Sequence, residues 1–373
     1  MVRLFLGPQF VNPRSIGRLR GAPLVIGKLF GRRYVNPDTP DTKYGRTPLL
    51  WAAKNGYEGI VKLFLGRKEV NPETPDTEHG RTPLSLAAEN GHEGIVKLLL
   101  ELKDVNPNTP DTRDVRTPLS WAAGNSHEGT VRLLLERKDV NPGTPDGLHG
   151  RTPLLRAAQN GHEGIVKLLL EWKNVNPNTT DTSYSRTPLS WAARNGHEGI
   201  VKLLLGRKDV DLNIPDQYGH TPLSWAAKNS HEGIVKLLLE REDVNSDTSA
   251  TWYGPTPLSW AARNGYEGIV KLFLERKDVN PNTPDTRYCQ QTPLSWAAEN
   301  GHEGVVKLLL ERKDVNPDTP DRYGRTPLSW AAKNGHERIV KLLLKRKDVI
   351  PNSSSNSGET PLQLATESGM IES

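Results

Sequence analysis

The sequence predicts an all-α solenoid, a stack of about ten similar helix pairs. The tripeptide Thr-Pro-Leu occurs ten times in the 373 residues, at intervals of 34 to 36 residues. Each copy is followed by two short apolar segments with helical spacing and then by a loop rich in proline and asparagine. The copies begin at Thr47, Thr82, Thr117, Thr152, Thr187, Thr221, Thr256, Thr292, Thr326 and Thr360.

The second copy shows what each repeat is expected to form. Thr82 before Pro83 is typical of a helix start, because threonine caps the first turn and proline is tolerated at the first helical position. Leu84, Ala87 and Ala88 follow at helical spacing, and the helix is expected to end at Asn90-Gly91, where glycine can adopt the left-handed conformation. A second helix is predicted from about His92 to Leu100 and is apolar on most sides, as in a helix packed between neighbours. Stacking would bury faces that one repeat alone leaves exposed.

The first 34 residues fit this pattern only as degenerate fragments. Residues 1–46 contain nine Lys or Arg and two acidic residues, and the rest of the chain carries a net charge of −2. We therefore expect basic repeat remnants at 1–34 and an array of about ten units at 35–373, the last of which ends after its first helix. The chain is then a monomer or part of a longer protein.

The repeat resembles the ankyrin repeat. The likeness rests on Thr82-Pro-Leu-Ser-Leu-Ala-Ala88, Asn90-Gly91-His92, Ile95-Val-Lys-Leu-Leu-Leu100 and Asp104-Val-Asn106, and it runs from about Tyr34 to the C-terminus. Membership implies antiparallel helix pairs, hairpin-like loops that project at right angles, and a concave surface that binds other macromolecules. Such nearly uniform arrays are similar to those attached to NOD-like receptor ATPases in fungi.

Two features depart from the ankyrin pattern. Serine replaces the histidine that follows Thr-Pro-Leu in the family, as at Ser85 and Ser120. This replacement removes the histidine that forms hydrogen bonds between neighbouring loops in the family, and serine can offer only a shorter substitute. A single lysine replaces Gly-Ala before Asp-Val-Asn, so the second helix is expected to end without a glycine cap.

Composition and motifs argue against several classes of function. The array is almost neutral although the chain has a pI of about 9.1, so nucleic-acid binding is not expected. No apolar stretch approaches the roughly 18 residues that a membrane helix needs. The single Cys289 fits a reducing compartment, the cytoplasm or nucleus. Without a recognisable catalytic, phosphate-binding or zinc motif, we expect no enzyme activity, cofactor or metal.

Two aromatic columns recur in the repeats and are expected to serve structure. Stacking keeps equivalent histidines about 8–10 Å apart, too far to share a metal ion, so they are interpreted as a polar start of the second helix. The tryptophans of the first helices are expected to pack between repeats, with partner contact as the alternative. The columns are His92, His127, His162, His197, His231, His302 and His336, and Trp51, Trp121, Trp191, Trp225, Trp260, Trp296 and Trp330.

The variable positions are the candidates for partner binding. The resemblance implies that partners contact the hairpin tips and the end of the first helix, and this array varies at both places. Aromatic residues beside cations suit an acidic or phosphorylated protein partner, although tip Tyr and Arg could also simply stack on each other. The helix-end candidates are Lys54, Glu89, Gln159, Arg194, Lys228, Arg263, Glu299 and Lys333, and the tip candidates are Tyr44, Arg46, His79, Arg81, Arg116, His149, Arg151, Tyr184, Arg186, Tyr218, His220, Tyr253, Tyr288, Gln291, Tyr323 and Arg325.

The leading hypothesis is a protein-binding scaffold or adaptor. One alternative is the ligand-sensing segment of a larger NOD-like signalling ATPase, and another is a regulator that occludes the active site of a partner enzyme. For the scaffold, replacing Arg81, Arg151 and Arg186 together is expected to weaken partner binding and to leave thermal unfolding nearly unchanged.

Overall fold

The computed structural model describes residues 38–247, 254–286 and 289–367. Within these ranges the chain forms nineteen helices and no strand, so the predicted all-α class is confirmed. The parts of the prediction that lie outside the described residues are the basic remnants at 1–34 and the tip candidates Tyr253 and Tyr288.

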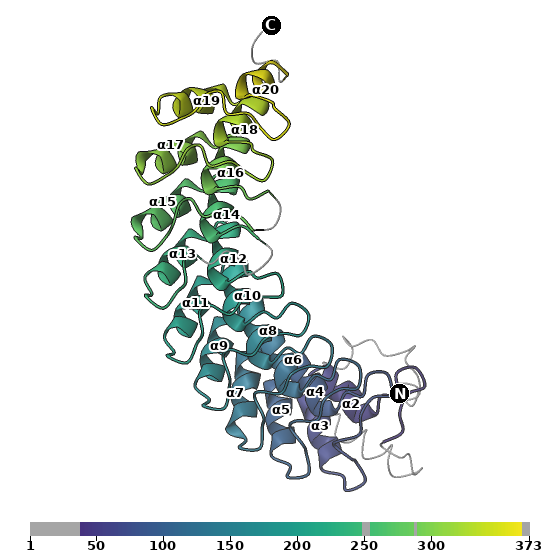
Figure 1. The fold of residues 1–373 in the computed structure, drawn as a ribbon. Coiled ribbons are helices and arrows are strands. Elements are labelled where there is room, and N and C mark those ends of the chain that lie inside the picture. Colours follow the sequence, from purple (N-terminus) through teal and green to yellow (C-terminus); the bar gives the residue numbers. More distant parts are fainter. Residues whose placement is uncertain (1–37, 248–253, 287–288, 368–373) are drawn as a thin grey trace. The chain divides into compact units, whose positions relative to one another are not determined.

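The chain divides after Asn176 into two compact units, unit 1 and unit 2. In each unit a short first helix is followed by a tight turn and a second helix, and a longer loop leads to the next pair (Figure 1). The helices of unit 1 are α2 (Pro48–Lys54), α3 (Glu58–Leu65), α4 (Pro83–Glu89), α5 (Glu93–Leu100), α6 (Pro118–Gly124), α7 (Glu128–Glu136), α8 (Pro153–Asn160) and α9 (Glu163–Leu170).

Unit 2 is built in the same way from five described pairs and one further first helix. Its helices are α10 (Pro188–Asn195), α11 (Glu198–Leu205), α12 (Pro222–Lys228), α13 (Glu232–Leu239), α14 (Pro257–Asn264), α15 (Glu267–Glu275), α16 (Pro293–Glu299), α17 (Glu303–Glu311), α18 (Pro327–Lys333), α19 (Glu337–Leu344) and α20 (Pro361–Glu367).

Helices of the same kind pack against one another within each unit. In unit 1 the first helices α2, α4, α6 and α8 contact one another in succession, and so do the second helices from α3 to α9. In unit 2 the same holds for the first helices from α10 to α20 and for the second helices from α11 to α19. Figure 1 shows the resulting two layers, which make each unit a stacked solenoid, as predicted.

The core lies between the two helix layers and between successive repeats. In the second repeat Leu84 and Ala88 of α4 and Val96 and Leu99 of α5 are fully buried. The alanines let neighbouring first helices approach closely, and the leucines fill the space between the layers. Equivalent residues are buried in the other described pairs, apart from Val340 of α19, which is part-exposed. Each repeat therefore relies on its neighbours for apolar contact.

The serines that replace the family histidine bond within their own helix caps. The hydroxyl of Thr82 accepts a hydrogen bond from the backbone N–H of Ser85, and the two hydroxyls lie 3.2 Å apart. The same hydroxyl pair, at 3.0 to 3.2 Å, recurs in five other repeats. These hydroxyls thus bond within their own caps and do not replace the family's histidine bonds between neighbouring loops, because the serine side chain is too short to leave its cap.

A bond between repeats comes instead from the histidine that precedes the second helix. Nε2 of His127 donates to the carbonyl oxygen of Glu89 in the preceding repeat, over 3.0 Å. The ring lies against Gly91, which has a φ of +70°, and a Cβ added to that glycine would come within 2.4 Å of it. The histidine column thus joins consecutive repeats, a role that its sequence pattern did not reveal.

The second helices end without a glycine cap in the left-handed conformation, as predicted. Arg137, just after α7, bonds instead to the end of α5, the second helix of the preceding repeat. Its Nη1 donates to the carbonyl oxygen of Leu100 over 3.0 Å. Its Nη2 also pairs with Asp139 at 2.5 Å. Arg312 and Arg346 make equivalent bonds in unit 2, so an arginine from the next repeat satisfies carbonyl groups that a cap would otherwise serve.

Candidate protein-interaction surface

Eight hairpins are each organised around one aspartate, which is buried in all of them but the first. Oδ1 of Asp111 accepts hydrogen bonds from the backbone N–H groups of Arg113 and Asp114, at 3.1 and 2.7 Å. The N–H of Asp111 donates to the carbonyl oxygen of Arg116, which closes the loop. The equivalent aspartates, here called the hairpin aspartates, are Asp41, Asp76, Asp111, Asp146, Asp181, Asp216, Asp285 and Asp321.

The second carboxylate oxygen of most hairpin aspartates holds the tryptophan of the first helix. In six repeats Oδ2 accepts a hydrogen bond from the indole Nε1–H over 2.6 to 3.1 Å. This bond fixes the ring beneath its own hairpin. The pairs are Trp51–Asp41, Trp121–Asp111, Trp191–Asp181, Trp225–Asp216, Trp296–Asp285 and Trp330–Asp321.

In unit 2, cations at the ends of three first helices lie between successive tryptophan rings. The guanidinium carbon of Arg194 is 5.3 Å from the ring centre of Trp191 and 5.0 Å from that of Trp225. Nζ of Lys228 is 5.0 Å from Trp225 and 4.1 Å from Trp260. The distances fall within the range of cation–π contacts.

Arg263 continues the alternation, at 5.5 Å from Trp260 and 4.3 Å from Trp296. We call this set the cation–tryptophan row; its members are Trp191, Arg194, Trp225, Lys228, Trp260, Arg263 and Trp296.

The three cations of the row have no acidic partner in the described part of the chain. No carboxylate oxygen lies within 4.0 Å of Arg194, Lys228 or Arg263 there. Burial lowers the pKa of Lys228, and the nearby Arg194, Arg263 and Arg186 lower it further against an opposing effect of Asp216. The row therefore gathers partly dehydrated positive charge that its own surroundings do not balance.

The corresponding positions of unit 1 differ. In its second, third and fourth repeats, the residues at the ends of the first helices are Glu89, Gly124 and Gln159. Arg81, which lies over the ring of Trp121, pairs with Glu89 at 2.6 Å. Arg81 is thus neutralised within unit 1, and Lys54, at 6.0 Å from the ring centre of Trp51, is the only helix-end cation of the four described repeats of this unit.

The tip candidates fall into two groups. The residue directly before Thr-Pro-Leu is buried in five repeats. It is Pro255 in one of them, and in the others it is Arg46, Arg186, His220 or Gln291, each at most 7% exposed. Nε of Arg186 pairs with Asp216 at 3.1 Å, so it links two neighbouring hairpins. We now expect its replacement to destabilise unit 2, unlike the replacement of a residue at an exposed tip.

The other tip and helix-end candidates are accessible to different degrees. Tyr184, Tyr218, Tyr323 and Lys333 are exposed. Arg46 and Arg186 stack on the rings of Tyr44 and Tyr184, at 4.6 and 4.5 Å. The part-exposed candidates are Tyr44, Lys54, His79, Arg81, Glu89, Arg116, His149, Arg151, Gln159, Arg194, Lys228, Arg263, Glu299 and Arg325.

Comparison with known proteins agrees with the geometry. A family model of ankyrin repeats (three copies) matches residues 23–111, 102–181, 173–248, 241–321, 258–353 and 305–373. The chain belongs to the ankyrin-repeat family. Ankyrin repeats are generally scaffolds for protein interaction and typically lack enzymatic activity. No curated protein matches the chain.

Two further observations on this ankyrin array concern sites other than protein contacts. Among the described residues, no three His, Cys, Asp or Glu side chains are grouped so that they could hold a metal ion. No helix in the same ranges has the length and apolar composition to cross a membrane.

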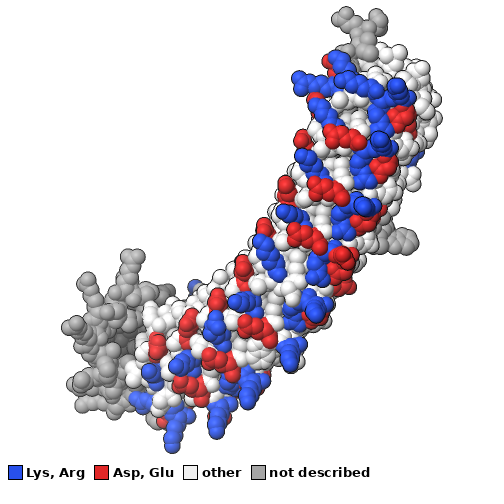
Figure 2. All heavy atoms as spheres, turned by 90° about the vertical axis from the view of Figure 1, so that its left-hand side faces the viewer, with Lys and Arg blue, Asp and Glu red and all other residues white. Residues whose placement is uncertain are grey.

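The second-helix face of the ankyrin array carries charge of both signs. Figure 2 shows basic and acidic side chains intermingled on this face of each unit. Several are paired along one helix, as Lys202 with Glu198 at 2.7 Å and Lys307 with Glu303 at 2.6 Å. Both pairs join residues four apart on one helix, and the described residues of this face form no region of a single sign.

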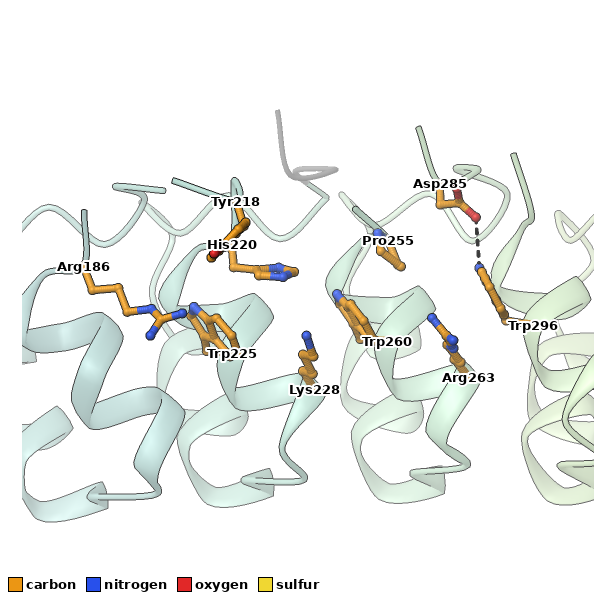
Figure 3. A pocket seen from close by; sticks show the side chains of 10 residues that line it. All are labelled: Arg186, Tyr218, His220, Trp225, Lys228, Pro255, Trp260, Arg263, Asp285 and Trp296. Carbon is orange, nitrogen blue, oxygen red and sulfur yellow. Dashed lines mark hydrogen bonds between the residues drawn. The ribbon is translucent and has the colours of Figure 1, made fainter. Parts of the chain in front are cut away.

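The opposite side of unit 2 contains a pocket of about 320 Å³ beside the row. Trp225, Trp260 and Trp296 line it together with Arg186, Lys228 and Arg263. His220 completes the wall, and Figure 3 shows its ring between Trp225 and Pro255. We call this cavity the Trp260 pocket.

The buried His220 should make unit 2 sensitive to acid. Burial lowers its pKa to about 4 from the ordinary 6.5, so the unfolded chain takes up a proton between these values and the folded chain does not. Stability should therefore fall as the pH decreases from about 6.5 towards 4. The variant His220→Gln introduces the residue found at the equivalent position Gln291, and glutamine does not titrate. Its free energy of unfolding should fall less than that of the natural protein between about pH 6.5 and pH 4. Urea unfolding at a series of pH values would measure the difference. The same pH dependence in both proteins would contradict this assignment.

Proposed function

We propose that this ankyrin protein is a scaffold or adaptor that holds an acidic or phosphorylated segment of a protein partner against the cation–tryptophan row. The observation that carries the proposal is the alternation of three unpaired cations with four indole rings. Charge-assisted hydrogen bonds to a partner would neutralise cations that now lack an acidic neighbour. Tryptophan and arginine are also the residues that contribute most at protein interfaces.

Residues around the row support an extended contact. Tyr184 and Tyr218 are exposed on hairpins that adjoin it, and tyrosine provides apolar area together with a hydrogen-bonding hydroxyl. Successive cations lie one repeat apart, so a partner in extended conformation could place several acidic groups along them. One free cysteine fits action in a reducing compartment, and we place the protein in the cytoplasm or nucleus.

Replacing Arg194, Lys228 and Arg263 together by glutamine should weaken binding of a short polyglutamate peptide at least about tenfold, equivalent to about 1.4 kcal/mol. The reason is the loss of all three unpaired positive charges of the row. Isothermal titration calorimetry at moderate ionic strength, with polyglutamine of equal length as the neutral control, would measure the affinity.

The matched control replaces Lys202, Lys236 and Lys271, which are exposed on the second helices of the same unit. This variant removes the same net charge from the chain, but on the second-helix face and not at the row. Because salt screens such distant charges at moderate ionic strength, the affinity for the peptide should stay almost unchanged. If both triple variants lost the same affinity for polyglutamate, binding would depend on net charge alone, and the proposal would be refuted.

A further inference from the structure

The sequence before α14 has no aspartate at the position of the hairpin aspartates. Asp146 and Asp181 lie six residues before Thr152 and Thr187, and the residue six before Thr256 is Ala250. The repeat nevertheless keeps its tryptophan, Trp260. Its first helix therefore has an indole donor without the carboxylate that accepts from this donor elsewhere.

Trp260 is accordingly the exception among the tryptophans of the first helices. Its Nε1 atom is buried, and no atom in the described ranges accepts a hydrogen bond from it. The six equivalent indoles all donate to a hairpin aspartate. A buried donor without a partner costs about 1–3 kcal/mol, so an acceptor that reached it would be bound favourably.

A second buried polar group in the same pocket also lacks a partner. His220 is 7% exposed, and its Nδ1 has no hydrogen-bond partner within the described part of the chain. Its ring centre lies 4.7 Å from that of Trp225 and 5.8 Å from that of Trp260. Figure 3 shows the ring reaching over the space between these two tryptophans.

The charge around the unpartnered indole is positive. Lys228 and Arg263 lie on the two sides of Trp260, as Figure 3 shows. The two carboxylates nearby are already engaged. Asp216 accepts from Arg186 and Trp225, and Asp285 accepts from Trp296 and from the backbone of Gln291.

We propose that the Trp260 pocket binds a carboxylate from an aspartate or glutamate side chain of the protein partner, which takes the place of the missing hairpin aspartate. The carboxylate accepts a hydrogen bond from the Trp260 indole and pairs with Lys228 and Arg263. A volume of about 320 Å³ admits an acidic side chain with part of its backbone. This inference rests on the proposed protein-binding function. It identifies the chemical group of the partner that contacts Trp260, in the middle of the cation–tryptophan row.

The test follows the indole N–H signal of Trp260 by NMR, assigned with Trp260→Phe. A blocked tripeptide with a central aspartate should move this signal downfield in a saturable way, and the tripeptide with asparagine should not. No movement with the aspartate peptide would overturn the proposal. A shift of the Trp260 signal with inorganic phosphate alone would also overturn the proposal, because the pocket would then bind a different anion and not specifically a carboxylate.

Ala250→Asp provides the matched variant, since it restores the aspartate found at the aligned position of other repeats. We expect its Trp260 signal to lie downfield without peptide, its thermal midpoint to rise, and its affinity for the aspartate tripeptide to fall at least about tenfold. A variant with the shifted signal that binds the tripeptide as tightly as the natural protein would overturn the proposal. Lys228→Gln is the second check: measured from its own free indole signal, this variant should bind the same tripeptide more weakly.

The outcomes separate this inference from the proposed function. If polyglutamate binding depends on the row but the aspartate tripeptide leaves Trp260 unaffected, the scaffold function stands and the pocket inference fails. If the tripeptide moves Trp260 but polyglutamate binds equally well without the three cations, the pocket inference stands and the proposed function fails.

Discussion

Replacing Asp216 by alanine should lower the free energy of unfolding of unit 2 by about 3–5 kcal/mol. Its carboxylate accepts from Nε of Arg186 and from Nε1 of Trp225, both at 3.1 Å, and from the backbone of Tyr218 and His220 at 2.9 and 3.0 Å. Both members of the ion pair are buried, so the variant leaves a charged guanidinium without a partner in a poorly hydrated place. Urea unfolding followed by circular dichroism measures the loss.

An exposed ion pair in the same unit supplies the control. Asp209 pairs with Arg207 at 2.5 Å, but its side chain is 55% exposed. Asp209→Ala should therefore cost less than about 1 kcal/mol, although it removes an ion pair of shorter distance. Similar losses in Asp216→Ala and Asp209→Ala would show that burial is not what gives the hairpin aspartate its effect.

The second large effect is expected at Phe273 in α15. This ring is 0% exposed and lies in the contact between the helix layers. Phe273→Ala should lower the free energy of unfolding by about 3–5 kcal/mol, because it removes apolar contact and leaves a cavity that the rigid stack cannot close. Chemical denaturation of the full chain would measure the change.

Phe273→Leu is the matched comparison, because leucine occupies the same position at Leu99, Leu238 and Leu309. Its cost should stay below about 1.5 kcal/mol. Equal destabilisation by alanine and leucine would mean that this site does not tolerate the side chain that its own repeat pattern favours.

The helices could be predicted from the sequence because their signals act over a few residues. The predicted start at Thr82 and Pro83 agrees with α4, and the second helix predicted from about His92 to Leu100 is observed as Glu93–Leu100. A threonine cap, a proline in the first turn and a glycine after the helix each act within one or two turns. Their effect therefore hardly depends on the rest of the fold.

The contacts between hairpins could not be predicted in the same way. Arg186 was placed at an exposed tip, yet it is 3% exposed and binds Asp216, thirty residues further along the chain. Such a bond depends on how one repeat is seated on the next. The sequence does carry one signal for the hairpins: an aspartate recurs five to seven residues before most Thr-Pro-Leu motifs, and Ala250 interrupts that column.

The most direct test of the binding surface is an NMR titration of the indole N–H signals with the polyglutamate peptide. If the row binds acidic segments, the signals of Trp225, Trp260 and Trp296 should move together. That of Trp121, beside Gly124 and the neutralised Arg81, should stay in place. Movement of Trp121 without the three row signals, or no movement at saturating peptide, would contradict a partner site on the row.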